Sequence, residues 1–586
     1  MKKLHGIGLS FILSALLFFL AGCSSFSGPV QEESGNQGEQ PTEQQAEKSA
    51  PQEDEGSEGN EDIYKSPWER KEFVYAVSPP RINLDPLHSF TSTEAQIYTA
   101  LYEGLVTYNP VTLQPSPGVA ERWEREENNR VYRFFIRTDA RYSNGDIITA
   151  EHVRDTLLLL IDSEGDSEYA GFLDVVKNAR DYRKGEISDP QEVGIYAEEE
   201  RVVRFELEHP AAHFLSVLCH HSFTPLHPEM RENPVWDTPE QVISNGPFSI
   251  AESSADELFL EKSSSYWDSE TVKLESLRIV YRDDEKEVTK DFNRGEIQWT
   301  ETPVAYNEIA DRDAIVVNEL FATSYYFFSS AEPPYDNPSV RRALALLIPW
   351  EEVRSSEYMN LPTSTLVPQI GSYPEVEGIM EKDEERALEL LEEEGFSGGS
   401  GLPRIKILIP EGEESRRIAE EMKKGWEEVL DLTVNIEEDA FHSYYDNLKE
   451  NSFTIGTLTW IGDFADPLTF LDMWTGDSNL NIAEYKQPEY DELIQKSLRE
   501  SGSERYETMA EAEKLLLSGA AVLPIKHSPA FNIIDTDIVE GWFPNPLDIH
   551  PFKYIHFGMP SIPEGVVRDF SRRGSDILSY SVLVSR

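Results

Sequence analysis

The chain has 586 residues and carries 108 acidic against 52 basic side chains, a formal net charge of −56. Such an acidic surface disfavours nucleic acid and anionic membrane as partners, and the length exceeds what one compact core can organise, so we expect several domains. The charge would suit cationic ligands or solubility in high salt. Because the acids are spread along the whole chain, we favour solubility.

The first 22 residues are typical of a bacterial export signal. Two lysines precede an apolar stretch over 7–20, which is too short for a comfortable membrane span. The Leu-Ala-Gly-Cys sequence that ends at Cys23 resembles the bacterial lipobox, whose cysteine receives lipid and becomes the mature N-terminus. We therefore expect a lipoprotein signal peptide over 1–22 and a lipid anchor on Cys23. The rest of the chain would lie outside the cytoplasm, in the cell envelope. An uncleaved membrane anchor is the alternative.

Residues 24–62 are rich in Ser, Gly, Gln, Pro and Glu and nearly lack large apolar side chains. Such a segment cannot bury enough surface to offset its ordering entropy, so we predict a disordered acidic tether over 23–64. The chain has two cysteines. With Cys23 assigned to lipid, Cys219 has no partner for an internal disulfide in the mature chain.

The first half of the body predicts strands and helices in alternation. A strand is expected over 73–77 and a helix over 94–105, where apolar residues recur every four positions. A strand over 131–137 and a hairpin turn at Asn144-Gly145 follow. Thr149 then stands where it can cap the next helix.

The second half predicts α/β structure. Asn337 precedes Pro338, which is typical of a helix N-cap followed by the first helical position. A later helix over 383–394 is closed by Gly395. The elements after it are expected as a strand over 404–409, a helix over 414–430 and a strand over 432–436. This strand–helix–strand order favours α/β layers.

Several motifs occur in a characteristic order between about residues 70 and 557. They are Leu84-Asp85-Pro86, Tyr102-Glu103-Gly104-Leu105, Pro117 to Glu121 with Trp123, Arg137 to Val153, Asn245 to Phe248, Tyr266-Trp267-Asp268, Asn337 to Arg341 and Asp463 to Leu471. In content and order they resemble the peptide- and nickel-binding family of bacterial ABC-importer substrate-binding lipoproteins, solute-binding protein family 5. The nearest likeness is to oligopeptide-binding proteins.

The resemblance implies an α/β, two-lobed periplasmic-binding-protein-like fold with a hinge of two crossing strands and a small third domain. Ligand would bind between the lobes, and closure would bury it. By this resemblance, lobe I is discontinuous over 65–101, 221–305 and 526–559, the small extra domain covers 102–220 and lobe II covers 306–525. Residues 560–586 match no motif and are expected as a C-terminal tail of unknown role.

The function implied is capture of oligopeptides or dipeptides outside the cytoplasm and their delivery to the permease subunits of an ABC importer. The resemblance implies a monomer that is not an enzyme and needs no cofactor. No H-E-x-x-H or P-loop pattern occurs in the chain. Two alternatives stay open: the same fold with nickel, haem, an opine or a sugar as ligand, or an exported enzyme such as a peptidase or glycosidase.

A peptide offers its receptor an ammonium, a main chain and a carboxylate. Asp463 matches the family aspartate that holds the peptide amino group, and such a charge-assisted pair is strongest in a dry cleft. The neighbouring acid, Asp466, stands before a proline and is expected to shape a turn. Tyr169 and Trp460 match aromatic residues of the family cleft, with ordinary core packing as the alternative for both.

The peptide main chain would be held by strand addition, which uses backbone groups of the receptor. The segments that match those of the family are Phe90, Thr91 and Ser92, and Thr459 to Ile461.

The positions that would bind the peptide carboxylate depart from the family pattern. Some oligopeptide binders carry arginines where this chain has Leu448 and Thr457. Another basic residue would have to serve, or the ligand is not an ordinary peptide.

A metal site is considered at Cys219, His220 and His221, with His227 further along, because thiolate and imidazole ligands suit zinc, copper or nickel. Adjacent histidines in a strand would point to opposite faces, so no metal site is predicted.

Overall fold

The structure is a computed structural model that describes residues 69–558, apart from 70, 80–81, 90, 166, 212, 356–360 and 450–452. The predictions made for the signal peptide, Cys23, the tether, Phe90 and the C-terminal tail lie outside these residues. No helix in the described part is long and apolar enough to cross a membrane.

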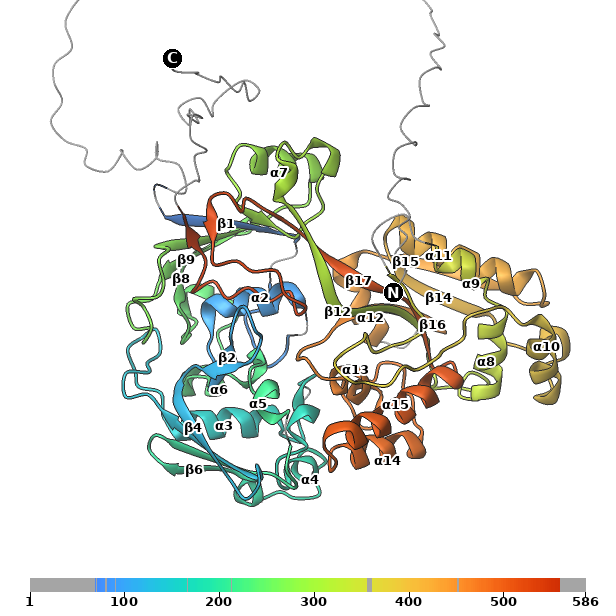
Figure 1. The fold of residues 1–586 in the computed structure, drawn as a ribbon, viewed down its shortest axis with the longest axis horizontal. Coiled ribbons are helices and arrows are strands. Elements are labelled where there is room, and N and C mark those ends of the chain that lie inside the picture. Colours follow the sequence, from blue (N-terminus) through green and yellow to red (C-terminus); the bar gives the residue numbers. More distant parts are fainter. Residues whose placement is uncertain are drawn as a thin grey trace, which may run out of the picture. The chain divides into compact units, whose positions relative to one another are not determined.

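One eleven-stranded sheet runs through the described body (Figure 1). Its order is β15-β14-β16-β12-β17-β11-β1-β10-β9-β8, with β13 beside β17. The strands are β1 (Glu72–Val77), β8 (Phe248–Ser253), β9 (Glu257–Lys262), β10 (Ser276–Tyr281), β11 (Trp299–Thr300), β12 (Ile315–Phe328), β13 (Leu361–Pro362), β14 (Ile405–Pro410), β15 (Val434–Asp439), β16 (Ile455–Ile461) and β17 (Val522–Ile534).

Two long strands, β12 and β17, join the two halves of this sheet. They pair with each other from Ile315 opposite Ile533 to Phe327 opposite Val522. On one side of the pair, β17 also pairs with β11, which in turn pairs with β1. On the other side, β12 also pairs with β16. The register shifts between Glu319 and Thr323, and such irregularities bend and twist a strand pair. The expected hinge of two strands between two lobes is therefore present.

The lobe beyond β16 is built from helices around β14 and β15, which pair in parallel across α11. Its helices are α8 (Pro338–Leu346), α9 (Trp350–Val353), α10 (Glu384–Glu393), α11 (Glu413–Glu427), α12 (Phe441–Lys449), α13 (Leu468–Leu471), α14 (Pro488–Ser497) and α15 (Gly502–Ser518). Trp426 of α11 is fully buried and donates a hydrogen bond from Nε1 to the carbonyl of Leu344 (2.7 Å). This contact ties α11 to α8 in the core of the lobe.

The other lobe holds a second, antiparallel sheet of order β4-β5-β7-β6. Its strands are β4 (Ala120–Glu126), β5 (Val131–Ile136), β6 (Ile195–Glu199) and β7 (Val202–Glu206). The remaining elements are β2 (Val106–Tyr108), β3 (Pro115–Pro117), β18 (Val539–Glu540), β19 (His556–Phe557), α2 (Ser92–Leu101), α3 (Ala150–Leu160), α4 (Ala179–Arg183), α5 (Phe214–Val217), α6 (Pro228–Glu232) and α7 (Glu285–Asn293).

The predicted helix caps are confirmed. Thr149 accepts a hydrogen bond from the backbone N–H of His152 (3.3 Å), and Asn337 accepts one from that of Ser339 (2.9 Å). Gly395 adopts a φ of 86° just after α10, in the left-handed region that glycine tolerates.

The helix expected over 94–105 is shorter at its end than predicted. It is α2, which begins at Ser92 and ends at Leu101. Gly246 packs so closely on the end of α2 that a Cβ on it would lie 2.4 Å from the carbonyl carbon of Leu101. The backbone N–H of Glu103 bonds instead to the side chain of Asn245 (3.1 Å). A tertiary contact therefore ends the helix before its apolar periodicity does.

Several motifs that are distant in the sequence meet at the buried carboxylate of Glu103. It accepts hydrogen bonds from the Tyr266 hydroxyl and from Trp267 Nε1 (both 2.6 Å), and Lys553 Nζ lies 3.3 Å away. Burial opposes the charge of Lys553, but Glu103 and nearby Asp268 more than compensate, so the pKa of Lys553 lies above its ordinary value. These contacts tie the segment after α2 to two distant parts of the chain, around Tyr266 and around Lys553.

Candidate functional site

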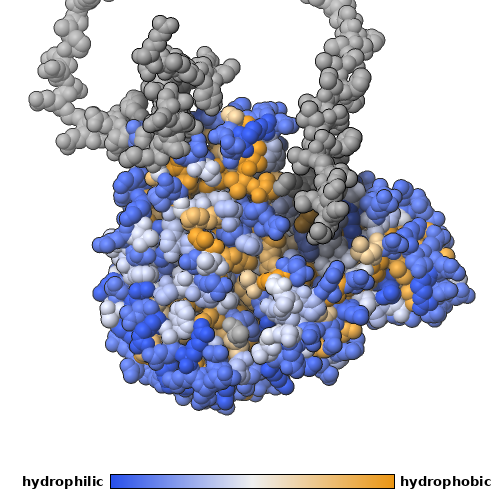
Figure 2. All heavy atoms as spheres, viewed as in Figure 1, coloured by the Kyte–Doolittle hydropathy of each residue, from blue (hydrophilic) through white to orange (hydrophobic). Residues whose placement is uncertain are grey.

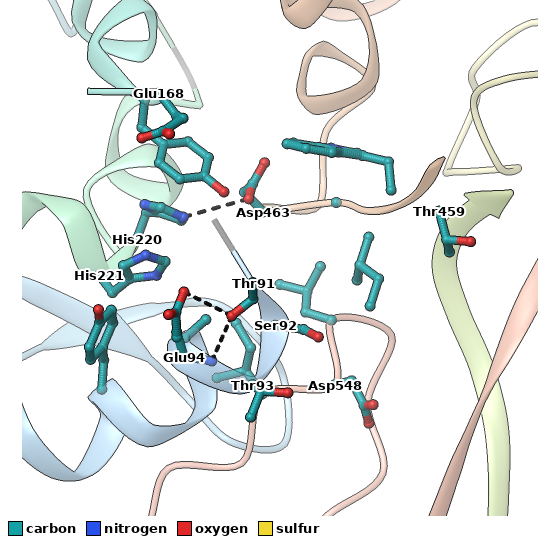
Figure 3. A pocket seen from close by; sticks show the side chains of 18 of the residues that line it. Thr91, Ser92, Thr93, Glu94, Glu168, His220, His221, Thr459, Asp463 and Asp548 are labelled. Atoms are coloured by element: carbon teal, nitrogen blue, oxygen red, sulfur yellow. Dashed lines mark hydrogen bonds and ion pairs between the residues drawn. The ribbon is translucent and has the colours of Figure 1, made fainter. Parts of the chain in front are cut away.

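A cavity of about 980 Å³ lies between the two halves of the molecule. Residues of α2 and the His220 region line it on one side, and residues of β12, β16, β17 and α12 line it on the other. Figure 3 shows the part of the cavity around Thr91, His220 and Asp463. Its size is at the upper end of the ~300–1,000 Å³ typical of ligand pockets. The outer face seen in Figure 2 is mainly hydrophilic, as the acidic composition predicts.

Asp463 lies just beyond the end of β16, with 9% of its side chain exposed. Its Oδ2 accepts a hydrogen bond from Thr469 Oγ1 (2.8 Å), and its carbonyl accepts one from the Tyr108 hydroxyl (2.7 Å). His220 Nε2 is 3.5 Å from its Oδ1. Because His220 Nδ1 accepts the N–H of Ser222 (3.3 Å), Nε2 carries the ring proton and faces the carboxylate. The carboxylate is thus oriented, and no described lysine or arginine forms an ion pair with it.

Tyr169 is buried, and its ring centroid lies 4.1 Å from that of His220. Burial raises the pKa of Tyr169 well above its ordinary value, and the nearby charge of Asp463 adds to the rise. The structure therefore brings Tyr169 and Asp463 together at one end of the cavity.

The strand β16 borders the cavity with an open edge. It pairs with β12 along its whole length, whereas β14 meets it only at Ile455. On the side away from β12, the Tyr444 hydroxyl accepts a hydrogen bond from the Thr457 N–H (2.9 Å) and donates one to the Thr457 carbonyl (2.7 Å). Backbone groups of successive residues alternate between the two edges of a strand, so those of Thr459 and Ile461 point to this same side. No partner within the described chain takes them.

The segment before α2 differs from the expected extended strand. Thr91 is extended and caps α2: its Oγ1 accepts the N–H of Glu94 (3.2 Å) and donates to Glu94 Oε2 (2.8 Å; Figure 3). Ser92 is already the first helical residue and is exposed. Both residues line the cavity, but the extended stretch stops at Thr91.

Trp460 also lines the cavity, with 7% of the residue exposed. Its side chain joins the hydrophobic core of the molecule, and its buried indole N–H has no partner among the described residues. It therefore contacts the cavity from within the core.

The positions matched to the family arginines are structural. Leu448 is fully buried, and Thr457 Oγ1 donates to the carbonyl of Tyr325 (2.9 Å). Three lysines that the sequence analysis did not single out do line the cavity: Lys449, Lys526 and Lys553. Lys449 directly follows Leu448, so a search one position to either side would have found it.

His220 and His221 do not lie in a strand with their side chains on opposite faces, so that prediction is wrong. Both lie at a 3-10 turn, and their ring centroids are 3.9 Å apart. Burial and the neighbouring His220 lower the pKa of His221 well below its ordinary value. Within the described ranges, no group of three or more His, Cys, Asp or Glu side chains is arranged to hold a metal ion.

Asp466 does more than shape a turn. Its Oδ2 and Oδ1 accept hydrogen bonds from Arg505 (2.6 and 2.9 Å), and both residues are buried. Burial alone would raise the pKa of Asp466, but the charge of Arg505 outweighs it and lowers that pKa. Asp466 is therefore a structural acid of the core.

A second set of contacts joins the lobes outside the cavity. Asp477 Oδ2 lies 2.9 Å from Arg180, 2.6 Å from Lys184 and 3.7 Å from Arg183. Arg183 also donates to the Asp477 carbonyl (2.9 Å) and pairs with Asp174 (2.7 Å). We call the contacts of Asp477 with Arg180, Arg183 and Lys184 the latch.

The chain is similar to known bacterial binding proteins. The family described as bacterial extracellular solute-binding proteins, family 5 Middle, matches residues 114–481. The dipeptide-binding protein DppE of Bacillus subtilis is 26% identical over 544 residues, which cover 89% of this chain and 93% of DppE.

Two solved structures show the same fold. A periplasmic oligopeptide-binding protein of Borrelia burgdorferi has a TM-score of 0.75 at 26% identity, over 83% of this chain and 99% of that one. The murein tripeptide-binding protein MppA of Escherichia coli has a TM-score of 0.75 at 24% identity, over 83% and 98%. The unliganded open form of MppA has a TM-score of 0.58. The lobes described here are thus arranged less like that open form.

Proposed function

Because the chain belongs to family 5 of the bacterial extracellular solute-binding proteins, we propose that it binds peptides between its lobes and delivers them to an ABC importer. Relatives that match most of the chain are a dipeptide-binding and an oligopeptide-binding protein of Bacillus subtilis. The observation that carries the proposal is the placement of Asp463 at the end of an open strand edge.

That placement suits a peptide N-terminus. An ammonium buried in the cavity needs a counter-charge, and Asp463 is oriented by Thr469 without a lysine or arginine to neutralise it. The open backbone groups of Thr459 and Ile461 supply hydrogen bonds whatever the peptide side chains are. Together they favour an extended ligand with a free amino end. Tyr169, Trp460 and Thr91 would form the walls around it, with Ser92 at the rim.

The finer parts of the proposal concern the whole chain. We propose that residues 1–22 direct export, that Cys23 carries the lipid anchor, and that the protein acts as a monomer outside the cytoplasm. We also propose the division into a discontinuous lobe I, an extra domain over 102–220 and a lobe II over 306–525. The separate sheet β4-β5-β7-β6 and the two joining strands support this division.

The test is a double-mutant cycle measured by calorimetry. Asp463→Asn keeps a hydrogen-bond acceptor but leaves the peptide ammonium without a counter-charge, which costs about 3–5 kcal/mol. Affinity should therefore fall by about two to four powers of ten. Acetylating the peptide N-terminus should weaken wild-type binding similarly and the variant much less.

The control is Asp446→Asn, which removes an exposed negative charge from the same cavity. It should leave affinity within about threefold of the wild type, because an exposed charge contributes little. Additive losses from Asp463→Asn and acetylation would show that the two groups do not meet and would refute the proposed binding mode.

A further inference from the structure

Three lysines of the described residues line the cavity, and they differ in how deeply their acidic partners are buried. Lys553 is buried among motif acids. Lys449 pairs with Glu168 (2.8 Å), whose side chain is 7% exposed, whereas Lys526 pairs with Glu414 (2.5 Å), whose side chain is 48% exposed. A half-exposed carboxylate can turn into water at small cost, but a buried one cannot. Lys526 is therefore the lysine whose partner a ligand can most readily replace.

A row of hydroxyl groups lies beside Lys526 on the cavity face of the hinge strands. Ser324 Oγ is 2.6 Å from Thr459 Oγ1 and 2.9 Å from Ser528 Oγ. Three hydroxyls have three protons, and two bonds among them use only two. One proton remains to be donated to a ligand acceptor. Ser528 is two residues from Lys526 on β17, and both line the cavity.

The Lys526 side chain lies on the same face of the hinge strands as Ser324, because the two residues pair opposite each other. Its partner Glu414 is the second residue of α11, and the carbonyl of the next residue, Ser415, accepts a hydrogen bond from the Tyr326 hydroxyl of β12 (3.1 Å). The Lys526 ammonium is therefore held on the cavity face of β12.

We propose that Lys526 and this hydroxyl row bind the C-terminal carboxylate of a peptide whose ammonium meets Asp463. The inference rests on the proposed peptide-binding function and adds the carboxylate site, which the family pattern leaves open here. Asp463 lies four residues beyond Thr459, about 13 Å along the strand at ~3.3 Å per residue. Lys526 pairs opposite Ser324, two strands from β16, or about 10 Å to the side at ~4.8 Å per strand.

These two offsets separate the backbone positions of Asp463 and Lys526 by about 16 Å. An extended peptide of about four or five residues covers about 13–17 Å. The site would thus favour short oligopeptides with both ends free.

The experiment measures binding of oligoalanines of three to six residues, each as the free acid and as the C-terminal amide, by calorimetry. For wild type, the free acids of four and five residues should bind best, and amidation should weaken them about 10- to 100-fold, as loss of a charged hydrogen bond does. Lys526→Met should bring the free acids to the level of the amides and leave the amides unchanged. Unchanged amide binding also shows that the variant is folded.

Two further variants make the test specific. Glu414→Gln removes the competing carboxylate and should strengthen the free acids severalfold while the amides stay as they were. Lys449→Met removes a second cavity lysine, the one that pairs with Glu168, and should preserve the difference between acid and amide.

Equal binding of acids and amides to wild type, or loss of their difference in Lys449→Met but not in Lys526→Met, would overturn the carboxylate site and leave peptide binding standing. Failure of every oligoalanine to bind wild type would overturn the proposed function itself.

Discussion

Asp477→Asn should shift the protein from its closed toward its open conformation without changing any residue that lines the ligand cavity. The latch brings three cationic side chains to one carboxylate, with the closest contact at Lys184 (2.6 Å). Burial alone would raise the pKa of Asp477, but hydrogen bonds from Lys184 and Arg180 outweigh it and lower that pKa to about 2. When the lobes part, Asp477 regains the pKa of a hydrated aspartate, about 3.9.

The magnitude follows from this difference in pKa. A lowering of nearly two units corresponds to about 2.5 kcal/mol at most. Water reaches the Asp477 side chain, which is 23% exposed, so screening reduces the contribution to about 1–2 kcal/mol. Removing it should shift the ratio of closed to open molecules about 5- to 30-fold toward open. Because the pKa is lowered in the closed state, the contribution is fully present above about pH 4 and is lost as the pH falls through about 2.

Solution scattering at pH 7 is the assay. Ligand-free Asp477→Asn should have a larger radius of gyration than wild type, and added salt should expand wild type toward the variant. Glu492→Gln removes an exposed acid from the same lobe and is the matched control. Identical scattering curves for wild type and Asp477→Asn, with and without salt, would refute the latch.

Three other substitutions give direct tests. Asp466→Asn leaves the buried Arg505 without its counter-charge, so urea unfolding should show a loss of about 3–5 kcal/mol in the free energy of unfolding. Gly246→Ala places a methyl group 2.4 Å from the backbone of Leu101 and should lower that free energy by about 1–3 kcal/mol. Cys23→Ala should move the protein from the detergent phase to the aqueous phase in a phase-separation experiment, or leave it unprocessed; wild type found in the aqueous phase would contradict the anchor.

Local features were predictable because their causes are local. Thr149 and Asn337 cap helices that begin one residue later, and Gly395 closes α10, since each bonds or bends within a few residues of itself. The strand–helix–strand unit around α11 was predictable for the same reason.

Features set by distant partners were not predictable in this way. The end of α2 depends on Gly246, and the orientation of the Asp463 carboxylate depends on His220. The latch joins residues about 300 positions apart, and Lys526 reads as an ordinary surface lysine until β17 places it over the sheet. The resemblance to a family supplied the position of Asp463 but neither its surroundings nor the lysines of the cavity.

Cys219 gives the protein a built-in probe of its own conformation. Cys219 is a half-buried residue in the wall of the cavity, and burial raises the pKa of its thiol. A chain whose Cys23 carries lipid has this one thiol left for a maleimide dye. The rate of labelling would then record how often the cleft exposes its interior. A fluorophore fixed at that position would turn the natural protein into an optical sensor of its cargo, with no residue replaced.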